Sequence, residues 1–149
     1  MRAVLQRVKS ASVTVGDERV SSIGTGHLIF LGVEENDTRQ DLEYMVDKIV
    51  NLRVFEDQNG KMNLSLKDVQ GELLVVSQFT LCGDCRKGRR PSFSSAAAAD
   101  IAEEYYEEFC KLCAEQGVPV QKGVFQAHME VELVNDGPVT ILLDSRRTF

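Results

Sequence analysis

The sequence lacks the features that would place it in a membrane, secreted or repeat class. No apolar run approaches the roughly 20 residues needed to cross a bilayer; the longest clear run is Leu28-Ile29-Phe30-Leu31. The opening residues 1–7 have neither the apolar core nor the small-residue cleavage site of a secretory signal. There is no internal repeat and no low-complexity linker. We therefore expect one cytoplasmic domain over residues 1–149, with no membrane partner.

Composition and charge exclude further classes. The 43% hydrophobic and 27% charged fractions are those of an ordinary globular protein, which excludes a disordered chain, a collagen-like repeat and a pure coiled coil. Seventeen basic residues stand against 23 acidic ones, a net charge of −6. A nucleic-acid-binding protein usually carries a basic surface, so the net charge argues mildly against one. We expect no DNA partner. A local basic patch is still possible, because salt screens distant charges.

Histidine is scarce, and the cysteines do not fall into a convincing metal pattern. His27 and His128 have no nearby nucleophile, and no G-x-S-x-G elbow supports a Ser-His-Asp triad. His128 alternates with charged residues, so we expect it to face solvent. Two C-x-x-C pairs, Cys82/Cys85 and Cys110/Cys113, could together hold zinc. The second pair lies within a predicted helix, where cysteine is a small hydrophobe. We therefore expect free thiols and no metal or other cofactor. A zinc-stabilised RNA-binding module remains the alternative.

The first part of the chain predicts strands followed by a helix. Runs rich in β-branched residues, separated by glycine-containing turns, predict strands at 4–15, 20–23 and 28–33. Thr38, with Asp41 three residues later, has the form of a capping box. The apolar residues that follow are spaced to form one helical stripe: Leu42, Met45, Val46, Ile49 and Val50.

The rest of the chain predicts one long buried strand, a second helix and two final strands. After strand 53–55 and a hairpin turn at Asn59-Gly60, the strand 73–81 opens with four apolar residues, which indicates burial on both faces. From Ser77 onward we expect Ser77, Phe79 and Leu81 to share one side. A helix over 95–116 precedes strands at 129–133 and 139–143, which a tight turn at 135–138 joins. The predicted apolar face of that helix is Ile101, Ala102, Tyr105, Phe109 and Leu112. The order predicts an α/β (α+β) domain with a mixed sheet and two main helices.

Three polar segments are candidates for chemistry. The segment 86–90 is a local excess of positive charge, suited either to phosphate capture by arginine or to a solvated loop. The segment 77–80 puts two hydroxyls and an amide at the end of a buried strand, where polar groups need partners or a ligand. The segment 135–138 ends in Gly-Pro between two good strands.

Two of these segments resemble a known family. Ser77-Gln78-Phe79-Thr80-Leu81 and Asn135-Asp136-Gly137-Pro138-Val139-Thr140 are similar to the two signature motifs of the D-aminoacyl-tRNA deacylases. The resemblance extends over nearly the whole chain, through residues 1–8, 60–66 and 86–93. It implies the fold of that family, with a partly open barrel. It also implies a homodimer with a cross-subunit active site that hydrolyses the ester joining a D-amino acid to the terminal ribose of tRNA.

The resemblance also implies a chiral filter. The Gly137-Pro138 peptide bond would be cis, and this dipeptide would enter the partner subunit's pocket and exclude L-amino acids. Glycine has no side chain to clash, so glycine mischarged on the tRNA for alanine would also be cleared. Five more residues are expected around the substrate: Ser77, Asn135, Thr140, and Phe125 and Met129 as pocket walls.

The residues of the first motif can be given roles in ester hydrolysis. The backbone N–H of Phe79 is the candidate oxyanion donor. Thr80 could be a nucleophile, as in a small-substrate esterase, but no activating base is visible nearby. We favour attack by water assisted by the ribose 2′-hydroxyl, with Gln78 and Thr80 positioning the reactants. The predicted tRNA contacts, which would be salt-dependent, are Arg86, Lys87, Arg89 and Arg90.

Overall fold

The computed structural model describes all residues 1–149 and has the predicted mixed α+β architecture, in one domain with two main helices. The elements, in chain order, are β1 (Arg2–Val15), β2 (Glu18–Ile23), β3 (Gly26–Gly32), α1 (Arg39–Asn51), β4 (Phe55–Glu56), β5 (Met62–Leu64), β6 (Glu72–Ser77), a 3-10 turn η1 (Phe79–Cys82), α2 (Ala99–Glu115), β7 (Val120–Lys122) and β8 (Glu130–Asp144). No helix is both long enough and apolar enough to span a membrane.

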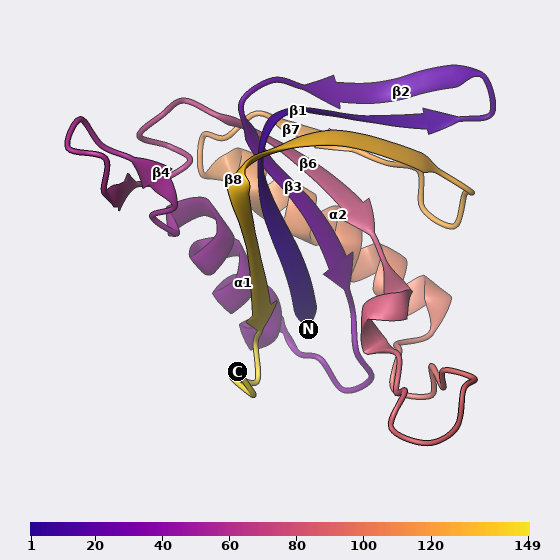
Figure 1. The fold of residues 1–149 in the computed structure, drawn as a ribbon. Helices are drawn as coiled ribbons and strands as arrows, with labels where there is room; N and C mark the ends of the chain where they lie inside the picture. The colour runs from indigo at the N-terminus through magenta and orange to yellow at the C-terminus, as the bar shows by residue number, and fades with distance from the viewer.

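One long central strand organises the main sheet. The order is β2-β1-β3-β6-β7, and β8 pairs with β1 along its other edge. The β1–β8 ladder is antiparallel and runs from Arg2↔Asp144 to Thr14↔Glu130. β3 with β6, and β6 with β7, are parallel. The far halves of β1, β2 and β8 bend away from β3 and β6, so the sheet is nearly closed (Figure 1).

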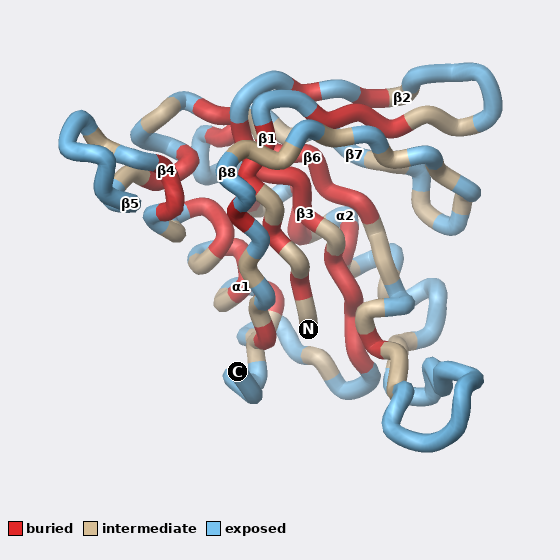
Figure 2. Tube along the Cα trace, in the orientation of Figure 1, coloured by how far each residue is buried: buried red, intermediate tan, exposed pale blue.

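The sheet has a hydrophobic core on each face. The larger cluster, of 22 buried residues, lies between the sheet and the two helices. A second cluster of seven lies inside the bend of the sheet. β6 contributes to both, with Leu73 and Val75 in the first and Leu74 and Val76 in the second. This confirms that the start of this strand is buried on both faces, and the buried tube runs along β3 and β6 in Figure 2.

Helix α1 forms as its sequence predicts. Both halves of the capping box between Thr38 and Asp41 are present. Asp41 lies in the first turn, where a carboxylate interacts favourably with the helix dipole. All five residues of the predicted apolar stripe are buried: Leu42, Met45, Val46, Ile49 and Val50.

Helix α2 is shorter than predicted and is rotated. Its buried stripe is Tyr106, Phe109, Cys110 and Cys113, at i, i+3, i+4 and i+7. The predicted face was wrong at Ile101, which is 44% exposed. The error came from treating the cysteines as marginal, whereas burial among apolar groups makes them part of the core. The Tyr106 hydroxyl completes the face by donating to the Val75 carbonyl oxygen at 2.8 Å.

The predicted end of the long buried strand was wrong. The strand predicted over 73–81 ends at Ser77, because its parallel ladder with β3 ends at Leu31↔Ser77 and β3 itself ends at Gly32. Residues 79–82 then form a 3-10 turn, so they do not alternate as a strand.

The turn predicted at 135–138 is instead a bulge within one strand, β8. The β1–β8 register passes from Gln6↔Thr140 to Val8↔Asn135. Residues 136–139 are therefore looped out opposite Arg7 without reversing the chain.

His27 is buried beside this bulge, where its ring packs in the core. It is paired with Arg7 across the β1–β3 ladder and stacks on Phe55 with ring centroids 5.1 Å apart. Neither ring nitrogen has a hydrogen-bond partner. Burial lowers the pKa of His27 to about 4, so its imidazole is neutral at pH 7.

Candidate active site

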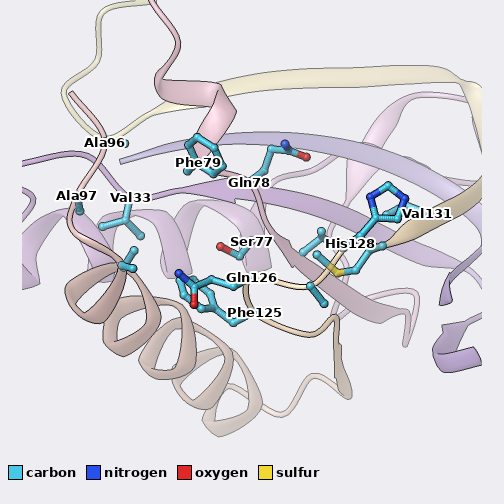
Figure 3. A pocket seen from close by; sticks show the side chains of 15 residues that line it. Val33, Ser77, Gln78, Phe79, Ala96, Ala97, Phe125, Gln126, His128 and Val131 are labelled. Carbon is cyan, nitrogen blue, oxygen red and sulfur yellow. The ribbon is translucent and has the colours of Figure 1, made fainter. Parts of the chain in front are cut away.

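A cavity of about 660 Å³ lies where β6 ends, between the start of α2 and the segment before β8 (Figure 3). Eleven of its 15 lining residues are hydrophobic. Ser77 and Phe125 face each other across it, and Gln78 and Phe79 lie at one end. Its shape and lining suit an apolar group bound beside a few polar atoms.

The structure brings together only some of the predicted site residues. Five line the cavity: Ser77, Gln78, Phe79, Phe125 and Met129. Thr80 is adjacent but does not line it. The residues of the β8 bulge and of the basic loop lie outside it: Asn135, Gly137, Pro138, Thr140, Arg86, Lys87, Arg89 and Arg90.

Sequence reasoning missed the wall made by small residues. Ala96, Ala97, Ala99 and Ala102 line the side of the cavity near α2. The signal is the alanine run 96–99, which lies at the start of the helix predicted over 95–116. Short side chains at the start of α2 leave the space that the cavity occupies. His128 also lies at the cavity, and it is exposed, as predicted.

The turn after β6 presents free backbone donors. The N–H groups of Phe79 and Thr80 have no hydrogen-bond partner in the chain, as expected at the first turn of a helix. The Gln78 side-chain amide donates to the Thr80 hydroxyl oxygen. The Phe79 ring is 56% exposed and packs edge-to-face on Phe93.

No base is hydrogen-bonded to the Thr80 hydroxyl. His128 lines the cavity but forms no hydrogen bond with Thr80. The one side-chain partner of the Thr80 hydroxyl is the amide of Gln78, which is not a base. This arrangement favours binding and polarising an ester over forming a covalent intermediate on Thr80.

Gly137 and Pro138 are exposed at the β8 bulge, which other residues of the chain hold in place. The peptide bond between them is cis, and Gly137 has φ +146°. Buried Arg7 supports the bulge by donating from Nε to the Asp136 carbonyl oxygen at 2.8 Å and from Nη1 to the Val54 carbonyl oxygen at 2.7 Å. No local pattern in the sequence marks Arg7, because its partners are distant in the chain.

Asn135 shapes the bulge from within. Its Oδ1 accepts the Val139 N–H at 2.8 Å, and its Nδ2 donates to the Val139 carbonyl oxygen at 3.0 Å. The same amide nitrogen lies 3.2 Å from Gln6 Oε1 and from Thr140 Oγ1. These bonds close residues 135–139 into a loop of defined shape.

The basic segment is an exposed loop that projects from the body of the molecule near the end of η1 (Figures 1 and 2). The Arg86 guanidinium pairs with Asp84 through two hydrogen bonds, of 2.9 Å and 2.7 Å, and holds the pKa of that carboxyl below its usual range. Lys87, Arg89 and Arg90 form no ion pair. The charge available to a ligand therefore comes mainly from these three residues.

The four cysteines do not come together in a metal site. Cys82, Cys110 and Cys113 are buried, Cys85 is exposed, and all four are free thiols. Burial raises the pKa of Cys82 to about 11 and that of Cys110 to about 12. No group of three or more His, Cys, Asp or Glu residues is arranged to hold a metal ion. The zinc-stabilised module is therefore not favoured.

The fold and the cavity define a small α+β protein whose apolar site ends near free backbone N–H donors, an arrangement suited to binding a carbonyl oxygen. Residues 4–144 match the profile of the family described as D-Tyr-tRNA(Tyr) deacylase. The chain belongs to this family, and it is a hydrolase that acts on ester bonds.

Relatives match over full length. D-aminoacyl-tRNA deacylases from Thermosipho africanus and Clostridioides difficile are 58% and 61% identical, with 100% of both chains covered in each case. A solved structure named c-Myc DNA Unwinding Element Binding Protein is 48% identical, with a TM-score of 0.92 over 97% of this chain and 98% of that one. A structure of a probable eukaryotic D-amino acid tRNA deacylase is 21% identical, with a TM-score of 0.80 over 95% of this chain and 97% of that one, and shows the same fold. The absence of a DNA partner stays a prediction.

Proposed function

We propose that the chain hydrolyses the ester bond of D-aminoacyl-tRNA and releases the free D-amino acid and tRNA. The observation that carries the proposal is the apolar cavity that ends at the free backbone N–H groups of Phe79 and Thr80. An ester carbonyl needs such donors when its oxygen becomes negatively charged, and one donor contributes about 2.7–4 kcal/mol. The names of the full-length relatives supply the substrate class.

In the proposed reaction a water molecule attacks the ester carbonyl carbon, and the bond from that carbon to the ribose oxygen then breaks. The proton that the water loses is taken up by the departing ribose oxygen. The Phe79 N–H stabilises the oxyanion. Gln78 and Thr80, which are hydrogen-bonded to each other, position the reactants. The ribose 2′-hydroxyl of the substrate assists the attack, since no base is hydrogen-bonded to Thr80. The amino-acid side chain lies against Phe125 and Met129, and Ser77 faces the same space.

The chiral filter belongs to this proposal. Gly137 and Pro138 are exposed and do not line the cavity of their own chain. In a homodimer they would enter the partner subunit's cavity and exclude an L side chain by contact, with Asn135 and Thr140 holding the bulge in shape. Val134 and Leu142 on β8 are 52% and 58% exposed, which supports burial of this strand between two subunits. Sedimentation equilibrium of the purified protein tests the dimer, and a monomeric mass would contradict it.

The proposal also includes a second substrate and a cell compartment. Glycine has no side chain for the Gly137-Pro138 filter to exclude, so glycyl-tRNA for alanine is a second proposed substrate. Charged tRNA is a cytoplasmic substrate, and we place the enzyme in that compartment. Hydrolysis of glycyl-tRNA, and cell fractionation, test these two points; spared glycyl-tRNA or a membrane-bound enzyme would contradict them.

The basic loop is the proposed tRNA contact, through Arg86, Lys87, Arg89 and Arg90. The double variant Arg89→Gln/Arg90→Gln should raise KM for aminoacyl-tRNA and leave kcat unchanged. Each phosphate contact contributes about 0.7–0.9 to the slope of log affinity against log salt, so the slope of log kcat/KM should fall by about 1.5. The exposed lysines of Lys61→Gln/Lys111→Gln provide a control with the same charge change. Equal effects of the two double variants would remove this role.

The central test is release of D-tyrosine from D-Tyr-tRNA, with L-Tyr-tRNA assayed in parallel. We expect rapid release of D-tyrosine while L-Tyr-tRNA is spared. Equal loss of both substrates would contradict the chiral filter, and release from neither would contradict the deacylase function. Thr80→Ala should slow D-tyrosine release on the order of tenfold, because Thr80 positions rather than attacks. A trapped acyl-enzyme on Thr80 would contradict the water mechanism.

A further inference from the structure

We propose that Arg2 is a positioning residue that holds the 3-10 turn η1 in its active geometry. This inference rests on the proposed function, in which the N–H groups at the start of that turn bind the oxyanion. Arg2 lies 77 positions from Phe79 in the chain, and neither sequence motif includes it. The guanidinium Nη1 of Arg2 donates to the Leu81 carbonyl oxygen at 3.1 Å.

The carbonyl that Arg2 contacts is in the last part of the turn. A short helix leaves its final carbonyls without intrahelical donors. In η1, Arg2 supplies a donor to the Leu81 carbonyl, and the Ser95 hydroxyl supplies one to the Cys82 carbonyl at 2.9 Å. Leu81 and Phe79 belong to the same four-residue turn, so a shift of the Leu81 peptide is transmitted to the free N–H groups. The end of the turn thus orients its catalytic start.

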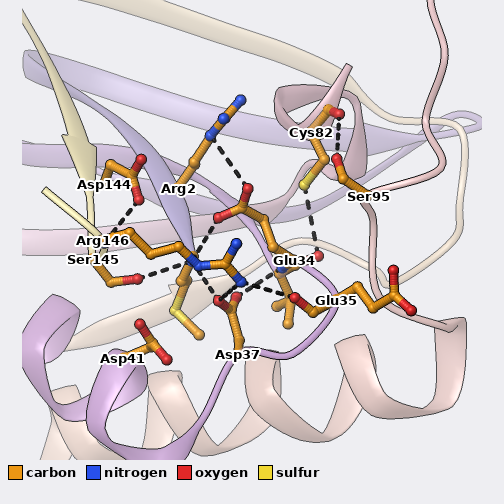
Figure 4. Close-up of polar contacts among 12 residues, drawn as sticks. Arg2, Glu34, Glu35, Asp37, Asp41, Cys82, Ser95, Asp144, Ser145 and Arg146 are labelled. Atoms are coloured by element: carbon orange, nitrogen blue, oxygen red, sulfur yellow. Dashed lines mark hydrogen bonds and ion pairs between the residues drawn. The ribbon is translucent and has the colours of Figure 1, made fainter. Parts of the chain in front are cut away.

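Glu34 holds Arg2 in place (Figure 4). Arg2 Nε lies 3.5 Å from Glu34 Oε1 and has no hydrogen bond, so the two form an ion pair. The Glu34 side chain is only 5% exposed, and its other oxygen accepts from the Met1 amino group at 2.9 Å. That amino group is also bound by Asp37 at 2.6 Å and by Ser145 at 2.9 Å. The arginine that holds the turn is therefore anchored to a network that also ties β1 to the end of β8.

Replacing Arg2 does not leave the buried carboxylate of Glu34 without a partner. Glu34 keeps the Met1 amino group as its partner when Arg2 is removed. Arg2 itself is 37% exposed along its side chain, so a replacement is partly solvated. The variant Arg2→Met keeps an unbranched stem and removes the donor. Arg2→Lys restores a donor and a positive charge.

Arg146 is a matched control within the same network. It is 45% exposed, and its Nη2 donates to the Glu35 carbonyl oxygen at 2.8 Å and lies 3.3 Å from Asp37 Oδ1. It forms no hydrogen bond or ion pair with η1. The variant Arg146→Met therefore removes an arginine of similar exposure and the same charge, and leaves the turn untouched.

The experiment compares kcat and KM for D-Tyr-tRNA in the wild type, Arg2→Met, Arg2→Lys and Arg146→Met, with the backbone amide NMR signals of Phe79 and Thr80 recorded for each. Displacement of a catalytic group from its productive position costs up to about 100-fold. We expect kcat to fall roughly 10- to 100-fold in Arg2→Met with KM nearly unchanged. Arg2→Lys should recover part of the loss, and Arg146→Met should retain the wild-type kcat. The two amide signals should move in Arg2→Met only.

The outcomes separate this inference from the proposed function. Wild-type kcat in Arg2→Met would overturn the inference, and so would an equal fall of kcat in Arg2→Met and Arg146→Met, which would indicate a merely structural network. If the wild type releases no D-tyrosine, the proposed function fails. The Phe79 and Thr80 amide signals then still report whether Arg2 positions the turn: unmoved signals in Arg2→Met would overturn that.

Discussion

Replacing Gly137 by alanine is expected to let the enzyme cleave L-aminoacyl-tRNA. Gly137 has φ +146°, a conformation that residues with a side chain rarely adopt. An alanine Cβ there would lie 2.8 Å from Val139 Cγ2 and 2.9 Å from Val139 N. Val139 is buried, and its N–H is hydrogen-bonded to Asn135 Oδ1. The bulge must therefore change shape, and with it the exposed Gly137-Pro138 surface. The ratio of L- to D-tyrosine release should rise about 100-fold or more, where each tenfold step corresponds to about 1.4 kcal/mol.

The measurement is the rate of amino-acid release from D- and L-Tyr-tRNA by the wild type and the variant. Gly60→Ala is the matched control, since Gly60 also has a positive φ, of +74°, but has open space around it and lies in the hairpin between β4 and β5. The control should cost some stability and leave the D/L ratio unchanged. A folded Gly137→Ala enzyme that still spares L-Tyr-tRNA would show that this bulge is not the filter.

The second large effect is on stability. Replacing Gly26 by alanine should prevent β3 from pairing with β6. The new Cβ would lie 1.8 Å from the Glu72 carbonyl oxygen and 2.7 Å from the Glu72 carbonyl carbon and backbone nitrogen. Gly26 is directly paired with Glu72 in the parallel ladder, so only separation of the strands relieves the clash. Both cores depend on that pairing, and the loss should reach about 4 kcal/mol, in the range of the most damaging single substitutions.

Urea unfolding of the wild type, Gly26→Ala and Gly24→Ala checks this expectation. Gly24 lies two residues earlier, and its nearest atom to an added Cβ is the Glu72 side-chain Oε1 at 3.5 Å, an ordinary contact. We expect Gly24→Ala to unfold within about 1 kcal/mol of the wild type, as most surface substitutions do. A Gly26→Ala protein as stable as Gly24→Ala would contradict the close approach of the strands.

Local patterns were reliable where one element decides its own structure. The capping box of Thr38 and Asp41 and the stripe from Leu42 to Val50 depend on spacing within one helix, and both formed as predicted. The apolar start of β6 likewise predicted burial on two faces. The errors lie where a partner decides. β6 ends because β3 ends. The buried face of α2 differs from the predicted face because Cys110 and Cys113 pack in the core.

The sequence by itself determined the fold class, the first helix, the family through its two motifs, and the candidate residues Gln78, Phe79 and Thr80. These depend on short-range periodicity or on contiguous strings, which need no knowledge of distant contacts. Only the tertiary structure decided how these parts are arranged in space. It set the cavity wall at Ala96 to Ala102, the support of the bulge by Arg7 and the hold of Arg2 on Leu81. Those contacts join residues 79 to 129 positions apart, or pack separate elements against each other, so no local pattern in the chain encodes them.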